Sequence, residues 1–369
     1  MSRTVVVGGG YAGVMAANRL AGSGQVTLVT KQPTFIERIR LHRAIIGREV
    51  GVGFGELLHP GVNLVIDAVS RIDSAAGTVT LTSAGELTFD HLVYAVGSGV
   101  ARPGSGMLDV NSYAAAMATR AELDQRPEAD VLVIGSGLTG VELAATLAVA
   151  GRRVSMVTSA AVNTRSAAAH LTRLGQLGVT IHRDTRFDPA MDTGQIIIDA
   201  TGFAVPPLAE HSGLPVAPDG RLLVDATLRV PGASHIVGAG DAVLIDDPSA
   251  AHLRPACATA LPMGAHAADV VAALQAGRRP ELFSLGYTVL NVDVGGGRGH
   301  IQLLRPDDGE HRLALTGRPG GAFKEFICRM TLTWLKQERK RPGRYSWRRG
   351  PAPQPASVEA DSLLERDRT

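Results

Sequence analysis

Two glycine triplets carry the clearest chemical signal in this chain. Each has the spacing G-x-G-x-x-G, follows a short apolar run and precedes a helix-like stretch. In such a turn the first glycine lets the chain leave a strand sharply, and the second leaves room for a pyrophosphate beside the backbone. The third lets helix and strand pack closely, with the phosphate at the helix N-terminus. The triplets are Gly8, Gly10 and Gly13, and Gly135, Gly137 and Gly140.

The whole strand, turn and helix pattern occurs twice, which is a much stronger signal than a single triplet. The apolar runs are Thr4 to Val7 and Ala129 to Ile134. The sequence therefore predicts two nucleotide sites, one for a flavin and one for a nicotinamide nucleotide. The alternative is a pair of ordinary strand–turn–helix units without a ligand.

An aspartate after a further glycine turn is the next candidate for a residue that binds the flavin. The run Ser234 to Ala242 reads SHIVGAGDA, so an apolar strand delivers Asp241 just after two glycines. A carboxylate there can accept a hydrogen bond from a ribityl hydroxyl of a flavin, while neighbouring amides face the pyrophosphate. The alternative is that Asp241 caps the next helix.

The segment Phe35 to Gly47 is dense in Arg and His. In a flavin-binding unit it would lie near the isoalloxazine ring, where Arg38, Arg40 and His42 would touch flavin or substrate. Cations there would also stabilise the anionic reduced flavin. Two alternatives stay open: a solvated helix face, and arginines that bind FAD phosphates or neighbouring carboxylates such as Glu37.

Two threonines stand where a ribose-binding acid is common in nucleotide-binding units. The strands expected at Val26 to Thr30 and at Arg153 to Thr158 end in a hydroxyl side chain instead of Asp or Glu. A small hydroxyl at Thr158, with Arg165 nearby in the sequence, accommodates a 2′-phosphate. This favours NADPH slightly, and both NADH and NADPH stay open.

Alternating strands and helices must position these residues, so the predicted fold class is α/β. We expect two doubly wound Rossmann-like dinucleotide-binding domains and a small C-terminal antiparallel α+β domain. The first domain is discontinuous, because the run that carries Asp241 returns to it. The predicted ranges are 1–109 with 224–284 for FAD, 110–223 for NAD(P), 285–350 for an interface domain and 351–369 for a disordered tail.

Composition narrows the function classes. The chain of 369 residues is 45% hydrophobic and 20% charged, an ordinary globular balance, and its net charge of +2 gives no general affinity for nucleic acid. The two cysteines, Cys257 and Cys328, exclude a disulfide framework, and no histidine spacing indicates a metal site. The N-terminus enters a strand almost at once, so we expect a cytoplasmic protein without a secretory signal.

An apolar stripe near the C-terminus bears on membrane contact. Phe323, Phe326, Ile327, Met330 and Trp334 recur at helical spacing, and seven Lys or Arg against one Glu follow between residues 336 and 349. The pattern resembles an interfacial anchor, which leaves peripheral membrane contact open. We favour packing of the stripe on the C-terminal sheet or on a second subunit.

The motifs VGGGYAG, LVYAVGS, IGSGLTGVE, DATG and VGAGDA come in the order found in FAD- and NAD(P)-dependent pyridine-nucleotide oxidoreductases. Within that family the chain most resembles type II NADH dehydrogenases and apoptosis-inducing-factor-like reductases. The resemblance implies FAD as cofactor, NADH or NADPH as co-substrate, and Glu142 as a catalytic carboxylate near flavin and nicotinamide. Besides the triplets, the residues implied to bind cofactor are Ala12, Arg40, Gly97, Gly202, Gly240, Asp241 and Pro262.

The chain departs from the resemblance in features that bear on the electron acceptor. The run PACATALPMG follows Asp241 where quinone-reducing members carry a glutamine-containing run. Disulfide reductases carry two redox cysteines in the first domain, and here no cysteine precedes Cys257. We therefore expect hydride transfer from NAD(P)H to FAD and then to a small-molecule or soluble acceptor, without a redox disulfide.

Two other functions stay open on the sequence alone. One is a tailoring flavin oxidoreductase that acts on a specific small molecule. The other is a nucleotide-binding flavoprotein with vestigial catalysis, which the threonines at Thr30 and Thr158 keep open. A homodimer is compatible with the C-terminal pattern, and no nucleic-acid partner is expected.

Overall fold

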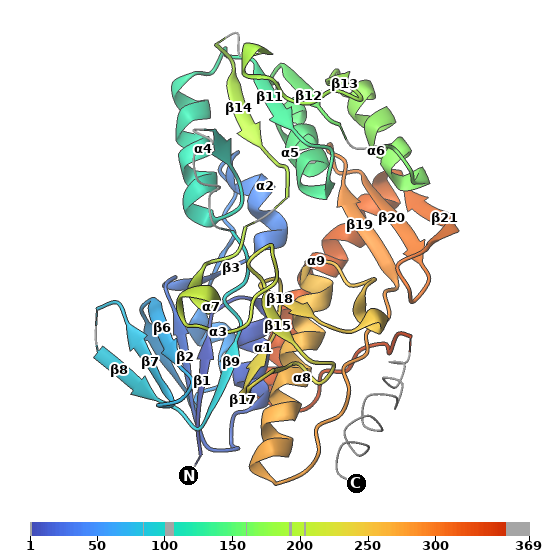
Figure 1. Ribbon diagram of the computed structural model, residues 1–369. Coiled ribbons are helices and arrows are strands. Elements are labelled where there is room, and N and C mark those ends of the chain that lie inside the picture. The colour runs from blue at the N-terminus through green and yellow to red at the C-terminus, as the bar shows by residue number, and fades with distance from the viewer. Residues whose placement is uncertain are drawn as a thin grey trace, which may run out of the picture.

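A computed structural model of the protein contains two mainly parallel β-sheets, one above the other in Figure 1, with a smaller antiparallel sheet beside them. The structure describes residues 2–83, 85–99, 107–159, 161–191, 194–202 and 204–351. The predicted disordered tail therefore lies, apart from Pro351, outside the described residues. The α/β fold class expected from the sequence is confirmed.

The lower sheet is assembled from two distant parts of the chain. Its strand order is β16-β17-β9-β1-β2-β5, and all neighbours pair in parallel except β16 with β17. The central strands are buried on both faces, which explains their apolar runs. The strands are β16 (Arg229–Val230), β17 (Ala233–Gly238), β9 (His91–Tyr94), β1 (Arg3–Val7), β2 (Gln25–Thr30) and β5 (Val62–Ile66).

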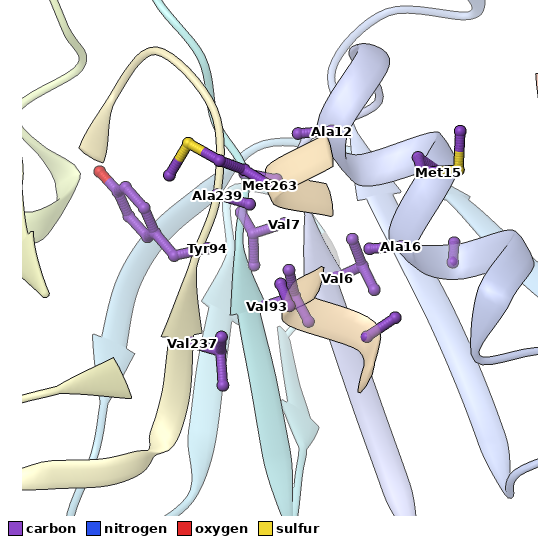
Figure 2. Packing of buried hydrophobic residues seen from close by; sticks show 14 of the residues in the cluster. Val6, Val7, Ala12, Met15, Ala16, Val93, Tyr94, Val237, Ala239 and Met263 are labelled. Atoms are coloured by element: carbon purple, nitrogen blue, oxygen red, sulfur yellow. The ribbon is translucent and has the colours of Figure 1, made fainter. Parts of the chain in front are cut away.

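Helices α1 (Tyr11–Arg19) and α8 (Cys257–Gln275) pack against each other on this sheet. Gly264 permits the contact, because a Cβ at that position would lie 2.2 Å from the Ala12 carbonyl oxygen. Figure 2 shows apolar side chains of β1, α1 and β9 packed with Met263 from α8. Although α8 is long and apolar enough to cross a membrane, 72% of that window is buried inside the protein. Its length and composition are therefore weak evidence for a span.

The upper sheet is parallel throughout, with the order β10-β14-β11-β12-β13. Ser112 and Thr164 begin two of its helices, since each side-chain oxygen accepts a hydrogen bond from a backbone N–H of the first turn. The strands are β10 (Leu108–Asp109), β11 (Val131–Ile134), β12 (Val154–Val157), β13 (Thr180–His182) and β14 (Ile196–Asp199). The helices are α4 (Tyr113–Gln125), α5 (Leu138–Val149) and α6 (Arg165–Gln176).

The C-terminal part combines an antiparallel sheet with a long helix. The sheet has the order β19-β20-β21, with β19 (Val289–Asp293), β20 (Gly299–Leu304) and β21 (Glu310–Thr316). Helix α9 (Gly317–Lys340) follows directly and runs back toward the lower sheet, where it packs against α1. This helix therefore touches the C-terminal sheet at one end and the lower sheet's helical layer at the other.

Helix α9 buries a different face from the one its apolar stripe indicates. Its buried positions include Lys324, Cys328, Thr331, Leu335 and Glu338, whereas Phe323 and Phe326 are 40% and 55% exposed. These two phenylalanines are not buried within the chain, and packing of the stripe on a second subunit stays a prediction. The other face is buried because Lys324 and Glu338 have ion-pair partners inside the protein.

Shorter elements complete the chain. Three antiparallel strands, β6 (Val69–Asp73), β7 (Thr78–Leu81) and β8 (Gly85–Thr88), connect β5 to β9. The other short elements are β3 (Thr34–Ile36), α2 (Leu41–Ala44), β4 (Gly51–Gly53), α3 (Phe54–Leu57), α7 (Leu208–His211), β15 (Leu222–Val224) and β18 (Val243–Ile245).

We expect Gly264→Ala to lower the free energy of unfolding by about 1–3 kcal/mol, because the new Cβ would push α8 away from the Ala12 backbone. Gly175→Ala is the matched control, since Gly175 lies inside α6 and a Cβ there meets nothing within 4 Å. Helix propensity stabilises the control by up to about 1 kcal/mol. Urea denaturation measures both, and equal stabilities would contradict the close-packing argument.

Candidate active site

The two glycine triplets adopt the same backbone geometry. A Cβ on Gly13 would lie 1.8 Å from the Gly8 carbonyl oxygen, and one on Gly140 would lie 2.1 Å from the Gly135 carbonyl oxygen. Gly8 and Gly135 also have positive φ angles of 115° and 100°. Only glycine fits these positions, so each helix starts in direct contact with the loop that precedes it.

The middle glycine of each triplet faces open space. Gly10 and Gly137 precede the first turns of α1 and α5, and a Cβ on either would meet nothing within 4 Å. Both N-cap residues are glycines without a side chain, so no side-chain oxygen from this position caps either helix. The first backbone N–H groups can therefore bind an anion, and each loop fits a pyrophosphate.

The two threonines at the strand ends face these loops. Thr30 is buried, and a Cβ on Gly9 would lie 2.7 Å from its hydroxyl oxygen. At the equivalent place in the second loop, the Ser136 and Thr158 hydroxyl oxygens lie 2.8 Å apart, within hydrogen-bond distance. The hydroxyl at each strand end thus contacts the loop itself, which explains why a small residue follows the first glycine.

Asp241 ends a hydrogen-bonded chain that joins three segments. Its Oδ2 accepts a hydrogen bond from the Ser98 hydroxyl at 2.9 Å. Arg38 donates to both the carbonyl oxygen and the hydroxyl of Ser98. The chain links the loop after β17, the loop after β9 and the short 3₁₀ helix Arg38–Arg40. The carboxylate is therefore held in one orientation, with a guanidinium close to it.

Tyr11, the first residue of α1, carries a buried hydroxyl. This hydroxyl has no hydrogen-bond partner among the described residues, and the ring packs edge-on against Phe35 at 5.0 Å. Thr331 and Cys328 of α9 lie near this hydroxyl, so it faces α9. The open space at Gly10 is the observation that indicates a bound group at this loop.

The other predicted cofactor residues surround the same loops. Gly97, Gly202 and Gly240 follow β9, β14 and β17, and all three have positive φ angles. Ala12 is buried in α1, and a Cβ added to Gly240 would lie 3.3 Å from the Ala12 Cβ. Pro262 lies inside α8. The contact of α8 with α1 holds the helix together where the proline ring removes a single backbone hydrogen bond.

Arg40 is engaged by carboxylates in this structure. Its Nη1 and Nη2 donate to the two carboxylate oxygens of Glu325 at 2.9 and 2.8 Å, and its Nε donates to Glu37 at 3.1 Å. The neighbouring Arg43 contacts Glu325 and Asp293. This arrangement supports the alternative weighed from the sequence, in which arginines of this segment pair with neighbouring carboxylates. Arg40 ties α9 to the segment before α2.

Glu142 lies at the centre of a cluster of charged side chains where the upper sheet meets the C-terminal part. Its Oε1 is 2.9 Å from the Lys324 Nζ and accepts a hydrogen bond from the Asp293 backbone N–H at 2.9 Å. Its Oε2 is 3.4 Å from Nδ1 of the buried His42. Four elements, α2, α5, β19 and α9, therefore converge on one carboxylate.

The electrostatics of the cluster keep Glu142 ionised. Burial by itself would raise the pKa of Glu142, but the Lys324 ammonium and His42 hold that pKa below its usual value. Burial would lower the pKa of Lys324, and Glu142 in turn holds it above its usual value. The pair is thus a carboxylate and an ammonium, buried together.

Lys324 is the functional residue that sequence reasoning missed. It stands within the apolar stripe of α9, and the stripe drew attention to the wrong face of the helix. The missed signal is the second periodic series, Lys324, Cys328, Thr331, Leu335 and Glu338, which has helical spacing and is buried. Lys324 is the first residue of this buried series, and a buried lysine needs a carboxylate partner. That partner is Glu142.

A family model described as pyridine nucleotide-disulphide oxidoreductase matches residues 2–269. The chain belongs to this family. The protein is therefore an oxidoreductase that uses FAD as cofactor and NAD(P)H as substrate, as the sequence predicted. The open glycine loops fit that cofactor chemistry.

Individual proteins also resemble this oxidoreductase. An NADH dehydrogenase-like protein of Mycobacterium tuberculosis is 30% identical over 322 residues, which cover 72% of this chain and 79% of the relative. Two solved structures share the fold with a TM-score of 0.74 each. The sulfide:quinone oxidoreductase of Aquifex aeolicus is 18% identical with 92% of both chains covered, and NDH2 of Plasmodium falciparum is 14% identical with 93% and 99% covered.

The Glu325 contacts with Arg40 and Arg43 give a pH-dependent contribution to stability. Its hydrogen bond with Arg40 lowers the pKa of Glu325 from 4.5 to about 2. The stabilisation is therefore complete above pH 4.5 and is lost as the pH falls toward 2. We expect Glu325→Gln to lower the free energy of unfolding by about 2 kcal/mol at pH 7, with a smaller difference from wild type at pH 4.

Urea denaturation at several pH values measures this difference. Glu128→Gln is the control, because Glu128 is exposed and its carboxylate forms no ion pair among the described residues. A destabilisation by Glu325→Gln that stays constant between pH 7 and pH 4 would contradict the assigned ion pairs.

Proposed function

We propose that this oxidoreductase transfers a hydride from NADPH or NADH to FAD and then passes the electrons to a soluble acceptor without a redox disulfide. The observation that carries the proposal is the pair of equivalent glycine loops, joined by a helix that contacts the surroundings of both. Helix α9 is tied to α1 by the Arg19–Glu338 ion pair and to α5 by the Lys324–Glu142 ion pair. FAD supplies the redox chemistry, and the residues below orient its partners.

The proposal assigns the lower sheet to FAD and the upper sheet to the nicotinamide nucleotide. Both would be doubly wound Rossmann-like domains, residues 1–109 with 224–284 and residues 110–223, and residues 285–350 would form an interface domain. The return of β16 and β17 into the lower sheet supports the discontinuous assignment. We propose a cytoplasmic location. Peripheral membrane contact and a homodimer, both through the C-terminal part, are further proposals.

In the FAD domain, Gly8, Gly10 and Gly13 would receive the pyrophosphate at the start of α1. Asp241 would accept a hydrogen bond from a ribityl hydroxyl, because Ser98 fixes its orientation while a carboxylate retains capacity for further donors. Arg38 would add positive charge near the flavin, which favours the anionic reduced form.

Glu142 and Lys324 would act where the two nucleotides meet. Lys324 keeps Glu142 ionised, so the carboxylate remains an acceptor near neutral pH. Its Oε2 faces His42 at 3.4 Å, a longer approach than either contact made by Oε1. Oε2 is therefore the oxygen with capacity to accept the N–H of a nicotinamide carboxamide and orient that ring.

The two thiols support electron transfer without a disulfide step. Burial raises the pKa of the Cys257 thiol to about 12 and also raises the pKa of Cys328. A redox-active cysteine needs an accessible thiolate near neutral pH, and these groups stay protonated there. Electrons would therefore leave the reduced flavin directly.

The surroundings of α8's N-terminus favour a polar acceptor. Thr259 lies in the run PACATALPMG, and its hydroxyl is 2.7 Å from the Arg254 carbonyl oxygen and 2.6 Å from the Tyr287 hydroxyl, so it is not free for a quinone carbonyl. Arg254 and Arg221 line a small cavity with Asp241. Both guanidinium groups are already paired, Arg254 with Asp308 and Arg221 with Asp219. The support for a polar acceptor over a long-tailed quinone is therefore the engaged Thr259 hydroxyl.

Anaerobic stopped-flow mixing of the FAD-loaded protein with each nucleotide tests the hydride transfer. We expect bleaching of the flavin absorbance with both nucleotides, faster with NADPH, because Thr158 replaces the ribose acid and Arg165 is exposed at the start of α6. Glu142→Gln should slow bleaching at least about tenfold, because an amide is a weaker acceptor than a carboxylate.

Glu128→Gln serves as the control and should bleach at the wild-type rate. Retained FAD content and circular dichroism show whether each variant is folded. If wild type does not bleach with either nucleotide, the protein is a binder and the proposed function is wrong. If Glu142→Gln bleaches like wild type, the function stands and the role of Glu142 is wrong.

Steady-state turnover with different acceptors tests the acceptor class. We expect faster turnover with ferricyanide than with ubiquinone or menaquinone analogues, because no free side-chain donor for a quinone carbonyl is present among the described residues at the start of α8. Quinone turnover at a kcat/KM of about 10⁴ M⁻¹s⁻¹ or more, the range of efficient enzymes, would contradict the proposed soluble acceptor.

A further inference from the structure

An open cavity of about 880 Å³ lies at the C-terminal end of α8, away from the glycine loops. Its walls come from residues after β15, from the end of α8, from the connection between α8 and β19, and from the last described residues of the chain. At 1.5 Å per helical residue, Leu274 in its wall is about 22 Å along α8 from Thr259. The cavity is therefore separate from the flavin site.

Four arginines and one acidic residue, Glu281, line this cavity. Arg349 pairs with Glu281 at 3.2 Å, and Arg229 pairs with Asp225 outside the cavity at 3.2 Å. Arg278 and Arg279 have no side-chain partner among the described residues. The lining side chains thus carry a net charge of +3, with two adjacent guanidinium groups available to a ligand.

The end of α8 does not cancel this charge. A helix C-terminus is equivalent to about −0.5 charge, which is much smaller than the side-chain charge. Its last carbonyl groups are already occupied, since the backbone N–H groups of Gly277 and Arg278 donate to the carbonyl oxygens of Leu274 and Ala273. The cavity is therefore electropositive.

Backbone hydrogen bonds hold the cavity walls in place. Phe283 N–H donates to the Ala226 carbonyl oxygen at 2.8 Å, which joins the α8–β19 connection to the segment after β15. The Gly350 N–H donates to the Ser284 hydroxyl at 3.0 Å, and the Trp347 indole donates to the Ser284 carbonyl oxygen at 2.9 Å. A ligand would thus meet walls that are already ordered, which lowers the entropic cost of binding.

Apolar side chains share the lining with the arginines. Leu274, Pro280 and Leu282 contribute carbon surface beside the charged groups, and Leu282 is 43% exposed. The volume falls within the range of small-molecule sites, which combine apolar lining with a few placed polar groups. Guanidinium groups match the geometry of phosphate oxygens through paired N–H donors.

We propose that this cavity binds a phosphate-bearing organic anion, with its phosphate groups on Arg278 and Arg279 and its carbon body against Leu274 and Leu282. The ligand is either a soluble organic phosphate or the headgroup of an acidic phospholipid, which offer the same chemistry. The proposal does not depend on the electron acceptor or on the hydride-transfer steps.

Isothermal titration of the FAD-loaded full chain with inorganic pyrophosphate tests the phosphate site. The glycine loop before α5 adds a second binding event that both double variants retain, so the cavity is measured by the event that the wild type shows in addition. Arg278→Gln/Arg279→Gln should weaken pyrophosphate binding at least tenfold. Arg312→Gln/Arg318→Gln is the matched control, because it removes the same charge from exposed arginines whose side chains have no partner among the described residues. The control should bind like wild type, and both variants should keep wild-type flavin reduction by NAD(P)H.

Co-sedimentation with vesicles distinguishes the two ligand sources. Pelleting with phosphatidic acid vesicles that is lost in Arg278→Gln/Arg279→Gln assigns the site to a lipid headgroup, whereas pyrophosphate binding without pelleting assigns it to a soluble phosphate. Equal loss of pyrophosphate binding in both double variants would show a bulk charge effect and overturn the proposal. Unchanged binding in Arg278→Gln/Arg279→Gln, or no binding by wild type, would overturn it as well.

Discussion

The buried ion pair between Glu142 and Lys324 is the constraint on which the relation between the upper and lower sheets depends. Each charge loses water on burial, and only the partner charge with further hydrogen bonds compensates for that loss. Glu142 gains a hydrogen bond from the Asp293 N–H, and Lys324 donates to the Asn291 carbonyl oxygen. A shift of α9 relative to α5 would leave both charges buried and unpaired. The pair therefore fixes where α9 lies.

Helix α9 carries this constraint to the lower sheet. Glu338, which is fully buried, pairs with Arg19 of α1 at 3.1 Å and accepts hydrogen bonds from the backbone N–H groups of Gly343 and Tyr345. Polar groups thus anchor both ends of the helix, and the apolar face with Phe323 and Phe326 stays exposed. The same physical rule explains both observations, because a buried charge must be paired and a partly exposed apolar side chain has no such requirement.

The fold and the two glycine loops followed from local sequence because their physics is local. A glycine that must hold positive φ, or that must let a helix touch its own loop, is required within a few residues of the strand it follows. Gly8 and Gly13 satisfy both conditions within a single turn, and the equivalent pair in the second unit repeats them. The order of strand, turn and helix therefore identified both units and the α/β class, and matching to the family confirmed the cofactor chemistry.

The sequence by itself thus determined the fold class, the two glycine loops and the family. Only the tertiary structure decided the partners of charged groups: Glu142 with Lys324, and Arg40 with Glu325. These pairs join residues separated by far more than a helical turn, and no local pattern specifies which carboxylate a given cation meets. No local pattern specifies the buried face of α9 either, because Lys324 and Glu338 lie inside only if their distant partners are already in place.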